Sequence, residues 1–172
     1  MILPINVKES DFKAAIAKFE AVLGKEWVFK SEEDLNLYRD AYSPQWDDED
    51  EPIPSLALAP KNVEEVQAIV KIANEYKIPL FPISTGKNLG YGSCAPQQRG
   101  QVVVDLKRMN KIIEVNDKRN FCIVEPGVSY FDLYEYVEKN NLNVFLDIPD
   151  PGWGSPLGNA LDHGWGYSYG MY

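Results

Sequence analysis

The chain has few of the residues that build metal centres and disulfide scaffolds. Its 172 residues include a single histidine, His163, and two cysteines, Cys94 and Cys122, which show neither CxxC nor Cys/His spacing. We therefore expect no structural zinc site, assign no metal ligand and interpret both cysteines as reduced thiols. The length corresponds to about one domain, which can bury a core without disulfide bonds.

Positive charge is also scarce, because 17 Lys and Arg residues stand against 26 Asp and Glu, giving a net charge of −9. This balance argues against nucleic acid or an anionic membrane surface as the partner. Part of the negative charge lies in the acidic run at residues 47–51. We interpret this run as a solvated loop, with the docking of a basic partner protein as the alternative.

Long apolar runs are missing as well. No window reaches the length of a membrane span, and the first residues, MILPINVKESD, lack the basic and apolar parts of a signal peptide. We expect no membrane span and a cytoplasmic location. The periplasm is the alternative if the chain is exported with a partner.

What the sequence does contain is helical periodicity in three places. Apolar residues at helical spacing predict a helix over residues 10–24, which ends at Gly24. Asn62 and Glu65 form a capping-box pattern ahead of a second helix. The third helix follows Ser129, which we expect to cap it together with Asp132, and it ends near residues 140–141.

Apolar strand-like runs surround these helices. The runs at residues 55–60 and 78–84 flank the second helix, which predicts a βαβ unit with parallel strands. Three further runs, at residues 101–106, 111–116 and 121–127, are spaced closely enough to predict an antiparallel meander. We therefore predict an α+β fold in which a βαβ unit precedes a mostly antiparallel sheet. Residues 1–54 would be an N-terminal helix and lead-in segment.

Two glycine-rich segments stand out. The first, PISTGKNLGYGS at residues 82–93, matches neither GxGxxG nor the GK[ST] ending of a P-loop. Its backbone N–H groups, hydroxyls and single lysine could still form an anion site for a diphosphate, with a tight loop between strands as the alternative. The second, residues 150–172, has six glycines and no Lys or Arg. Two such segments suggest one large ligand, because glycine allows close approach of the backbone.

Several linked motifs carry a family resemblance. From about residue 55 to residue 167 the chain resembles the FAD-binding half of the vanillyl-alcohol oxidase and p-cresol methylhydroxylase flavoproteins. The stretches that carry it are PISTGKNLGYGS, VVVDLKRMNKIIEV, VEPGVSYFDLYEYVEKNN and LDIPDPGWGSPLGNALDHGWGY. The resemblance implies FAD as the cofactor. It also implies that residues 55–172 are a partial FAD-binding domain of the vanillyl-alcohol oxidase type, without its cap or substrate domain.

The resemblance also assigns cofactor-binding residues. The pyrophosphate loop would comprise Ser84, Thr85, Gly86, Lys87, Asn88, Leu89 and Gly90. The adenine side would be lined by Glu125, Pro126, Gly127 and Val128. The ribityl and isoalloxazine parts would be surrounded by Gly154, Ser155, Gly158, Asn159, Gly164 and Tyr167.

Two catalytic residues follow from the same resemblance. Tyr91 matches a tyrosine that hydrogen-bonds the phenol oxygen of the substrate, and Asp150 matches an acidic residue near flavin N5. The implied reaction oxidises a para-alkylphenol by hydride transfer from the benzylic carbon to N5 through a quinone methide. Asp150 favours the oxidase and eugenol-type branch over the p-cresol methylhydroxylases, which usually carry a small neutral residue there. Without the resemblance, Tyr91 would be an ordinary core aromatic and Asp150 a turn residue. His163 lies where the family commonly has arginine, and we interpret it as a polar residue near the cofactor.

The resemblance also sets expectations about partners. The last residues, GYSYGMY, depart from the family's GYTPYG, and the rest of the FAD domain and the substrate cap are expected elsewhere. The expected partners are a small phenolic substrate and, in addition, a second chain that supplies the cap or a cytochrome c electron acceptor. The alternatives are a truncated FAD-binding or interaction module without catalysis, and an FAD-linked 2-hydroxy-acid oxidoreductase on the same fold.

Overall fold

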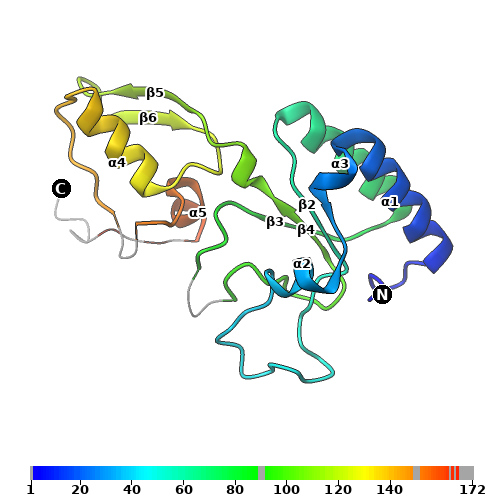
Figure 1. The fold of residues 1–172 in the computed structure, drawn as a ribbon. Coiled ribbons are helices and arrows are strands. Elements are labelled where there is room, and N and C mark those ends of the chain that lie inside the picture. The colour runs from blue at the N-terminus through cyan, green and yellow to red at the C-terminus, as the bar shows by residue number, and fades with distance from the viewer. Residues whose placement is uncertain (1, 89–91, 149–151, 163, 165, 167–172) are drawn as a thin grey trace.

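The chain folds into two lobes that meet at a narrow junction (Figure 1). The computed structural model describes residues 2–88, 92–148, 152–162, 164 and 166. In the right-hand lobe of Figure 1, two long helices pack on a four-stranded sheet. In the left-hand lobe, a two-stranded hairpin lies above a third helix and a short fourth one.

The sheet of the right-hand lobe has the strand order β1-β2-β4-β3. Its strands are β1 (Val28–Phe29), β2 (Leu56–Leu58), β3 (Leu80–Ile83) and β4 (Val102–Asp105). β4 runs parallel to both β2 and β3, whereas β1 is antiparallel to β2. Ile83 pairs with Asp105, so β3 and β4 end at the same edge of the sheet. The first glycine-rich segment begins at this edge, where open α/β sheets bind ligands.

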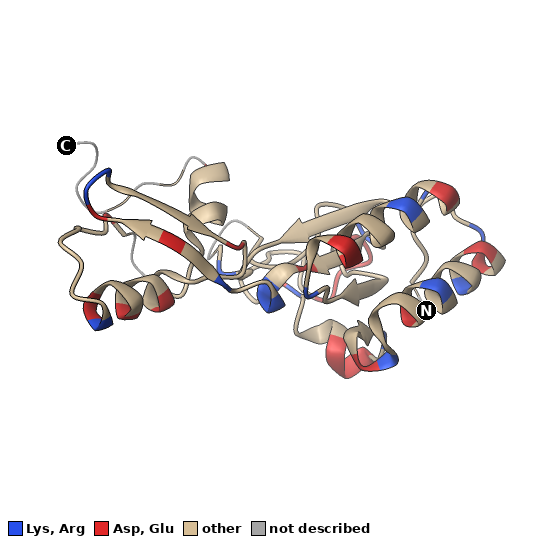
Figure 2. Ribbon diagram, turned by 90° about the horizontal axis from the view of Figure 1, so that it is seen from above, with Lys and Arg blue, Asp and Glu red and all other residues tan. Residues whose placement is uncertain are grey.

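The helices α1 (Glu9–Leu23) and α3 (Val63–Tyr76) enclose the core against this sheet. Fully buried members of the core include Phe12 and Phe19 of α1 and Ile69 of α3. Gly24 ends α1 at φ +89°, a backbone conformation that side chains disfavour. Charged residues of both signs are spread over the outward faces of the helices (Figure 2).

The left-hand lobe is built from β5 (Ile112–Asn116), β6 (Phe121–Val124), α4 (Tyr130–Lys139) and α5 (Pro156–Leu161). β5 and β6 form an antiparallel hairpin. Backbone bonds of 2.9 Å run from Tyr130 N–H to the Gly154 carbonyl and from Phe131 N–H to the Gly152 carbonyl. They fasten the segment before α5 to the beginning of α4. Short elements complete the chain: η1 (Lys25–Trp27), α2 (Glu32–Asn36) and η2 (Leu106–Arg108).

The three predicted helices are confirmed, and their caps are mostly as expected. Ser129 and Asp132 form the complete capping box of α4. At α3 only half of the box is present, because the Asn62 side chain accepts from Glu65 N–H while the Glu65 carboxylate accepts from Lys61 N–H. The prediction that Asn62 caps α3 is therefore confirmed. The Glu65 carboxylate binds the N–H of the residue before Asn62, and not that of Asn62 itself.

The predicted three-stranded meander is wrong in one strand. The run at residues 101–106 does not join β5 and β6, because β4 is the parallel strand that separates β2 from β3. All four residues of β4 are buried. A continuous buried run is typical of a central parallel strand, since both of its faces are covered. The α+β class itself is confirmed, with a βαβ crossover followed by an antiparallel hairpin.

The boundary at residue 55 stays a prediction. α1 and β1 share their core and sheet with β2, α3 and β4. In the part of the chain that the structure describes, no helix combines the length and apolar character needed to cross a membrane.

One residue of the acidic run is not solvated, contrary to expectation. Glu51 is only 2% exposed. Its carboxylate accepts hydrogen bonds of 2.6 and 2.5 Å from the Arg39 guanidinium, which also bonds Asp47 at 2.6 Å. The guanidinium lies over the Trp46 ring, 3.7 Å from its centroid. This ion pair closes the loop between α2 and β2, while the rest of the acidic run is exposed.

We predict that Glu51→Gln lowers the free energy of unfolding by about 3 kcal/mol, because it removes the buried carboxylate of the ion pair and leaves the largely buried Arg39 charge with the exposed Asp47 as its partner. The hydrogen bonds from Arg39 hold the pKa of Glu51 below its ordinary value of 4.5. A group with a lowered pKa in the folded state stabilises above its unfolded pKa and loses this contribution as the pH falls through the folded value. The advantage of the wild type over Glu51→Gln should therefore begin to decline as the pH falls below about 4.5 and disappear below the folded pKa of Glu51.

Urea unfolding of both proteins between pH 3 and pH 7 measures this difference. Glu49→Gln is the matched control, because Glu49 belongs to the same run but is exposed. Equal, small effects of the two substitutions at pH 7 would contradict the prediction.

Candidate functional site

The three segments predicted to bind the cofactor converge at the junction of the two lobes. Ser155 Oγ donates a hydrogen bond of 2.9 Å to the Pro126 carbonyl, which joins the second and third segments. Asn88 Nδ2 donates a bond of 2.7 Å to Asp162 Oδ2, which joins the first segment to the end of α5, 74 positions away. Parts of the chain as far apart as residues 84 and 162 therefore meet at one place.

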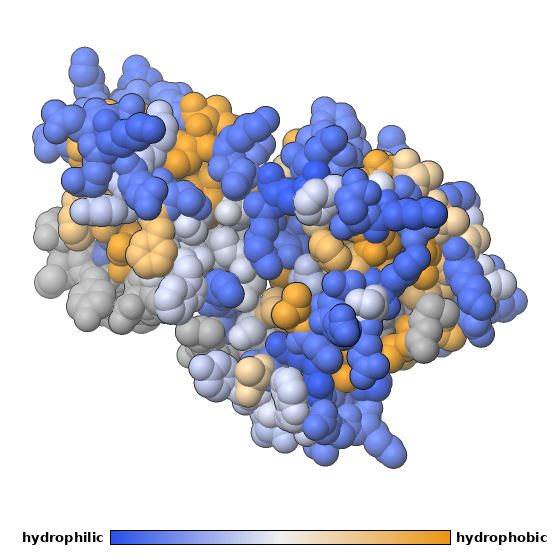
Figure 3. Space-filling view, viewed as in Figure 1, coloured by the Kyte–Doolittle hydropathy of each residue, from blue (hydrophilic) through white to orange (hydrophobic). Residues whose placement is uncertain are grey.

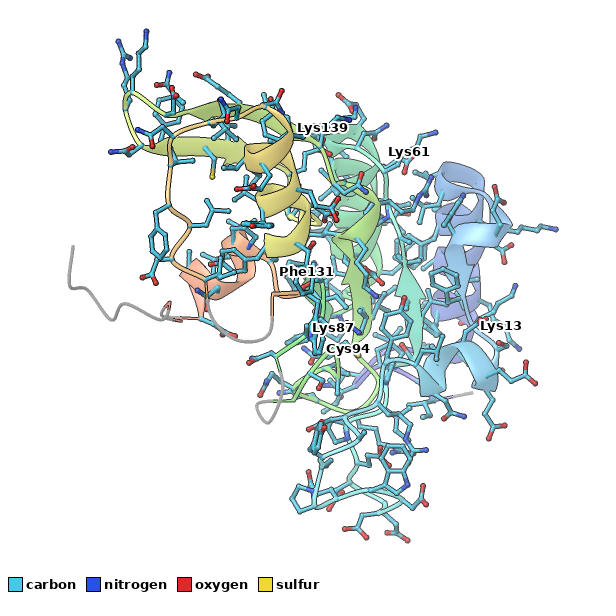
Figure 4. The ribbon with its side chains drawn as sticks, turned by 60° about the vertical axis from the view of Figure 1, so that its left-hand side comes forward. Lys13, Lys61, Lys87, Cys94, Phe131 and Lys139 are labelled. Atoms are coloured by element: carbon cyan, nitrogen blue, oxygen red, sulfur yellow. The ribbon has the colours of Figure 1, made fainter. Side chains whose placement is uncertain are left out.

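The first segment is a loop with little room for side chains. Thr85 is buried. Gly86 has φ +65°, and a Cβ added there would lie 2.9 Å from the Cβ of Cys94. Within the described part of the chain, no group accepts a hydrogen bond from the backbone N–H of Gly86 or Lys87. Lys87 is exposed and lies near Cys94 at the junction, below Phe131 (Figure 4). The loop thus offers N–H donors and one cation side by side.

The second segment is a turn that packs on η2, directly after β4. Val128 N–H donates to the Glu125 carbonyl at 3.1 Å, and Gly127 N–H donates to the Met109 carbonyl at 2.7 Å. A Cβ on Gly127 would lie 2.6 Å from the carbonyl oxygens of Leu106 and Lys107. Since these oxygens belong to the backbone, only glycine fits.

Side chains of the second segment make contacts within the protein, which leaves them unavailable to a ligand. The carboxylate of Glu125 accepts from Lys111 N–H at 2.8 Å. Val128 is completely buried. Contact with a ligand from this segment would therefore come from its backbone and from Pro126, which is half-buried.

The third segment contains α5 and its N-cap, Ser155. The Ser155 hydroxyl accepts from Gly158 N–H at 3.3 Å while it donates to Pro126. A Cβ on Gly158 would lie 2.5 Å from Ser84 Oγ, which brings the first segment against α5. Asn159 Nδ2 donates to the Tyr130 hydroxyl at 3.1 Å. Burial raises the pKa of Tyr130, so this hydroxyl stays protonated at neutral pH.

A buried cluster beneath the site was missed by sequence reasoning. The Tyr38 hydroxyl donates to Asp105 Oδ2 at 2.9 Å, and Lys107 Nζ lies 3.0 Å from the same carboxylate. Asp105 is 4% exposed and ends β4 beside the first glycine segment. Burial, and then the charge of Asp105, raise the pKa of Tyr38. The signal available in the sequence was an aspartate directly after three consecutive valines.

Asp162 and Tyr130 were also missed, since their roles depend on contacts far along the chain. Several predicted residues lie outside the described part of the structure. These are Leu89, Gly90, Tyr91, Asp150, His163 and Tyr167. Gly164 is described, and its N–H donates to the Asn159 carbonyl at 2.7 Å. The catalytic roles given to Tyr91 and Asp150 therefore stay predictions.

The residues present suit a dinucleotide diphosphate. The N–H groups of Gly86 and Lys87, which have no acceptor among the described residues, and the ammonium of Lys87 are the donors that phosphate oxygens require. The close approaches at Gly86, Gly127 and Gly158 are to Cys94, to backbone oxygens of η2 and to Ser84, so these glycines let the three segments pack tightly against their neighbours at the junction. No group of three or more His, Cys, Asp or Glu side chains that could hold a metal ion occurs among the described residues.

Comparison with known proteins agrees with this arrangement. A family model described as an FAD binding domain matches residues 54–172. The flavoprotein subunit of 4-cresol dehydrogenase (hydroxylating) from Pseudomonas putida is 44% identical over 99% of this chain and 33% of its own length. A D-2-hydroxyglutarate dehydrogenase from Stutzerimonas stutzeri is 34% identical over 76% of this chain and 28% of its own length.

Solved structures give the same result. p-Cresol methylhydroxylase with substrate bound superimposes with a TM-score of 0.91 and 43% identity, covering 95% of this chain and 32% of that one. An isoeugenol complex of 4-ethylphenol oxidase from Gulosibacter chungangensis also gives 0.91, with 40% identity over 95% of this chain and 31% of that one. The chain thus spans about a third of the length of the cresol and ethylphenol enzymes it matches.

We predict that Ser155→Ala weakens FAD binding about fivefold, because it removes the cap of α5 and the link to Pro126, a loss of about 1 kcal/mol. Quenching of flavin fluorescence on titration of the protein measures the affinity. Ser129→Ala is the matched control, since Ser129 caps α4 and does not bond the second segment. Equal loss of FAD affinity in both variants would show that the effect is only one of helix capping.

Proposed function

Because this chain belongs to the FAD-binding domain family and FAD is its cofactor, we propose that it forms the cofactor-holding part of an oxidoreductase that oxidises para-alkylphenols. The observation that carries the proposal is the convergence of residues 84–88, 125–128 and 154–159 at one junction. It is supported by the matched cresol and ethylphenol enzymes, which share 40% to 44% of their aligned residues with this chain.

In this proposal the first segment binds the diphosphate of FAD. The N–H groups of Gly86 and Lys87 donate to its oxygens, and the Lys87 ammonium balances its charge. The backbone around Pro126 borders the adenine side, and the Ser155 cap holds that turn against α5. Bound FAD supplies two-electron redox chemistry and accepts the hydride that leaves the benzylic carbon of the substrate.

The substrate end of the proposal depends on Tyr91 and Asp150. The Tyr91 hydroxyl would donate to the phenolate oxygen and stabilise its negative charge. Loss of hydride from the benzylic carbon of a phenolate gives a neutral quinone methide. Asp150 would accept a proton from the water that adds to it, so that a 4-hydroxybenzyl alcohol forms.

Further polypeptide is part of the proposal. The matched enzymes are about three times as long as this chain, so about two thirds of each has no counterpart in it. We propose that a continuing or separate chain supplies the substrate cap, and that either oxygen or a cytochrome c reoxidises the flavin. The Pseudomonas putida relative is a flavoprotein subunit, which supports an assembly with a second subunit.

A second candidate is an FAD-linked oxidoreductase of 2-hydroxy acids, favoured by the 34% identity to D-2-hydroxyglutarate dehydrogenase. The substrates discriminate the two: a phenol needs donors around a single phenolate oxygen, whereas a 2-hydroxy acid needs a cationic partner for its carboxylate. A binding module without catalysis is the third possibility, and it would hold FAD but reduce it with neither substrate.

The first test concerns the cofactor. We expect the purified chain to bind FAD, and Lys87→Gln to raise the dissociation constant about tenfold through loss of a charge-assisted phosphate contact. Lys139→Gln is the matched control, because Lys139 ends α4 far from the junction (Figure 4). The change in the flavin absorption band on binding is measured in both titrations. No perturbation of the band in the wild type would overturn the cofactor assignment for this chain.

The second test concerns the substrate. The protein in its complete assembly is loaded with FAD and mixed under anaerobic conditions with 4-cresol, 4-hydroxybenzyl alcohol or D-2-hydroxyglutarate. Bleaching of the flavin band by the phenols alone is the expected result. Bleaching by the hydroxy acid alone would favour the second candidate, and a band that none of the three bleaches would favour the module without catalysis.

A further inference from the structure

A second, smaller core cluster lies on the face of the sheet that is turned away from α1 and α3. Val102 and Val104 of β4 pack with those helices, whereas Val103 packs with Tyr38 and Ile83. Successive side chains of a strand point to opposite faces, which places Tyr38 against the second face. Tyr38 is only 6% exposed. The loop that follows it, at the bottom of Figure 3, presents mainly hydrophilic residues in that view. Tyr38 therefore packs on the sheet and does not belong to the solvated loop.

The Tyr38 hydroxyl fixes the strand end from which the first glycine-rich segment begins. It donates a hydrogen bond of 2.9 Å to Asp105 Oδ2, and Asp105 pairs with Ile83, the last residue of β3. Residues 84–88 follow directly. Burial, and then the charge of Asp105, raise the pKa of Tyr38, so the hydroxyl remains a donor at neutral pH.

The carbonyl of the preceding residue fixes the chain at the other end of the same segment. Cys94 Sγ donates to the Leu37 carbonyl at 3.2 Å. A Cβ on Gly86 would lie 2.9 Å from the Cβ of Cys94, so the position of Cys94 determines the path of the loop at Gly86. Cys94 and Lys87 lie close together at the junction (Figure 4). The segment is therefore held at both ends by two neighbouring residues.

These two anchors bear on the binding of a phosphate group. Backbone N–H groups bind phosphate only when they point at its oxygens, since a hydrogen bond weakens steeply as its angle departs from linear. A loop that is held in its binding conformation also loses less entropy when the ligand arrives. Residues 37 and 38 precede the part of the chain that matches the family model, which is residues 54–172.

We propose that Tyr38 is a positioning residue for the cofactor: together with the Leu37 carbonyl, it holds residues 84–94 in the conformation whose N–H groups bind the diphosphate of FAD. Tyr38 acts through Asp105 and Cys94 and does not touch the ligand, because its hydroxyl is already bonded to Asp105. The proposal rests on the diphosphate role of the first segment stated under the proposed function.

The first test removes the hydroxyl and keeps the ring. Tyr38→Phe should raise the dissociation constant of FAD about fivefold, and that of inorganic pyrophosphate by the same factor, because both ligands depend on the same N–H groups. Quenching of flavin fluorescence measures the first constant, and displacement of FAD by pyrophosphate measures the second. Tyr42→Phe is the matched control, since Tyr42 belongs to the same loop but is 69% exposed, and it should change neither constant.

A second comparison separates positioning from a general loss of stability. Glu51→Gln breaks the buried ion pair of the same loop, but Glu51 bonds neither Asp105 nor Cys94. It should therefore change the dissociation constant of FAD by less than about twofold, although it destabilises the fold more than Tyr38→Phe does. If stability alone governed FAD binding, Glu51→Gln would have the larger effect.

The thiol of Cys94 reports on the second anchor. In a Cys122→Ser background Cys94 is the only thiol of the chain. Without FAD, Tyr38→Phe should raise the rate at which this thiol reacts with a chromogenic disulfide reagent by about fivefold, because the loop opens more often. Cys94→Ala, which keeps the Cβ beside Gly86 and removes the bond to Leu37, should weaken FAD and pyrophosphate binding about twofold, since a thiol is a weak donor. This variant decides the question if Tyr38→Phe does not fold.

Several results would overturn the proposal. Equal FAD affinities of Tyr38→Phe and Tyr42→Phe would do so, as would a loss of FAD affinity without a matching loss for pyrophosphate. An unchanged reaction rate of Cys94 in Tyr38→Phe would show that residues 37 and 38 do not hold the loop. A wild type that binds FAD which pyrophosphate does not displace would instead count against the diphosphate role of the first segment, and thus against the proposed function as well.

Discussion

The architecture of the junction depends on the hydrogen bonds and the ion pair that the buried carboxylate of Asp105 makes. A buried carboxylate is costly unless it is hydrogen-bonded and balanced by charge. The Tyr38 hydroxyl and the Lys107 ammonium meet this need, and Lys107 N–H donates to the other carboxylate oxygen at 3.0 Å. Three parts of the chain are thereby fixed at the end of β4: the segment after α2, the turn η2 and the strand itself. The carbonyls of η2 then form the surface on which Gly127 packs.

Local features were predictable from the sequence, because their causes are local. The cap at Asn62, the capping box at Ser129 and the C-terminal Gly24 each depend on residues within one helical turn. The placement of β4 was not predictable in this way. Three consecutive valines fit an antiparallel strand and a central parallel one equally, and only the packing of α1 and α3 on the sheet decides between them. The same holds for Glu51, whose burial depends on Arg39, 12 positions earlier in the chain.

In the candidate site, too, local features were predictable from the sequence and long-range contacts were not. Clustered glycines indicated that the backbone must come close to something, and the clashes at Gly86, Gly127 and Gly158 give the physical reason at each position. The identity of the ligand came from the resemblance, because glycine spacing alone matched neither common phosphate motif. The contacts that bring the segments together could not be foreseen. They join Asn88 to Asp162 and Ser155 to Pro126, pairs that the three-dimensional fold alone makes neighbours.

The two lobes contribute differently to the cofactor site. The phosphate-binding loop extends from a sheet whose core is well enclosed, whereas Ser155 and Asn159 belong to a lobe whose apolar surface is largely open. A ligand that contacts both lobes stabilises the arrangement in which they meet, by an amount set by its concentration and affinity. Cofactor binding and the packing of the two lobes at the junction are therefore linked thermodynamically, and each is expected to strengthen the other.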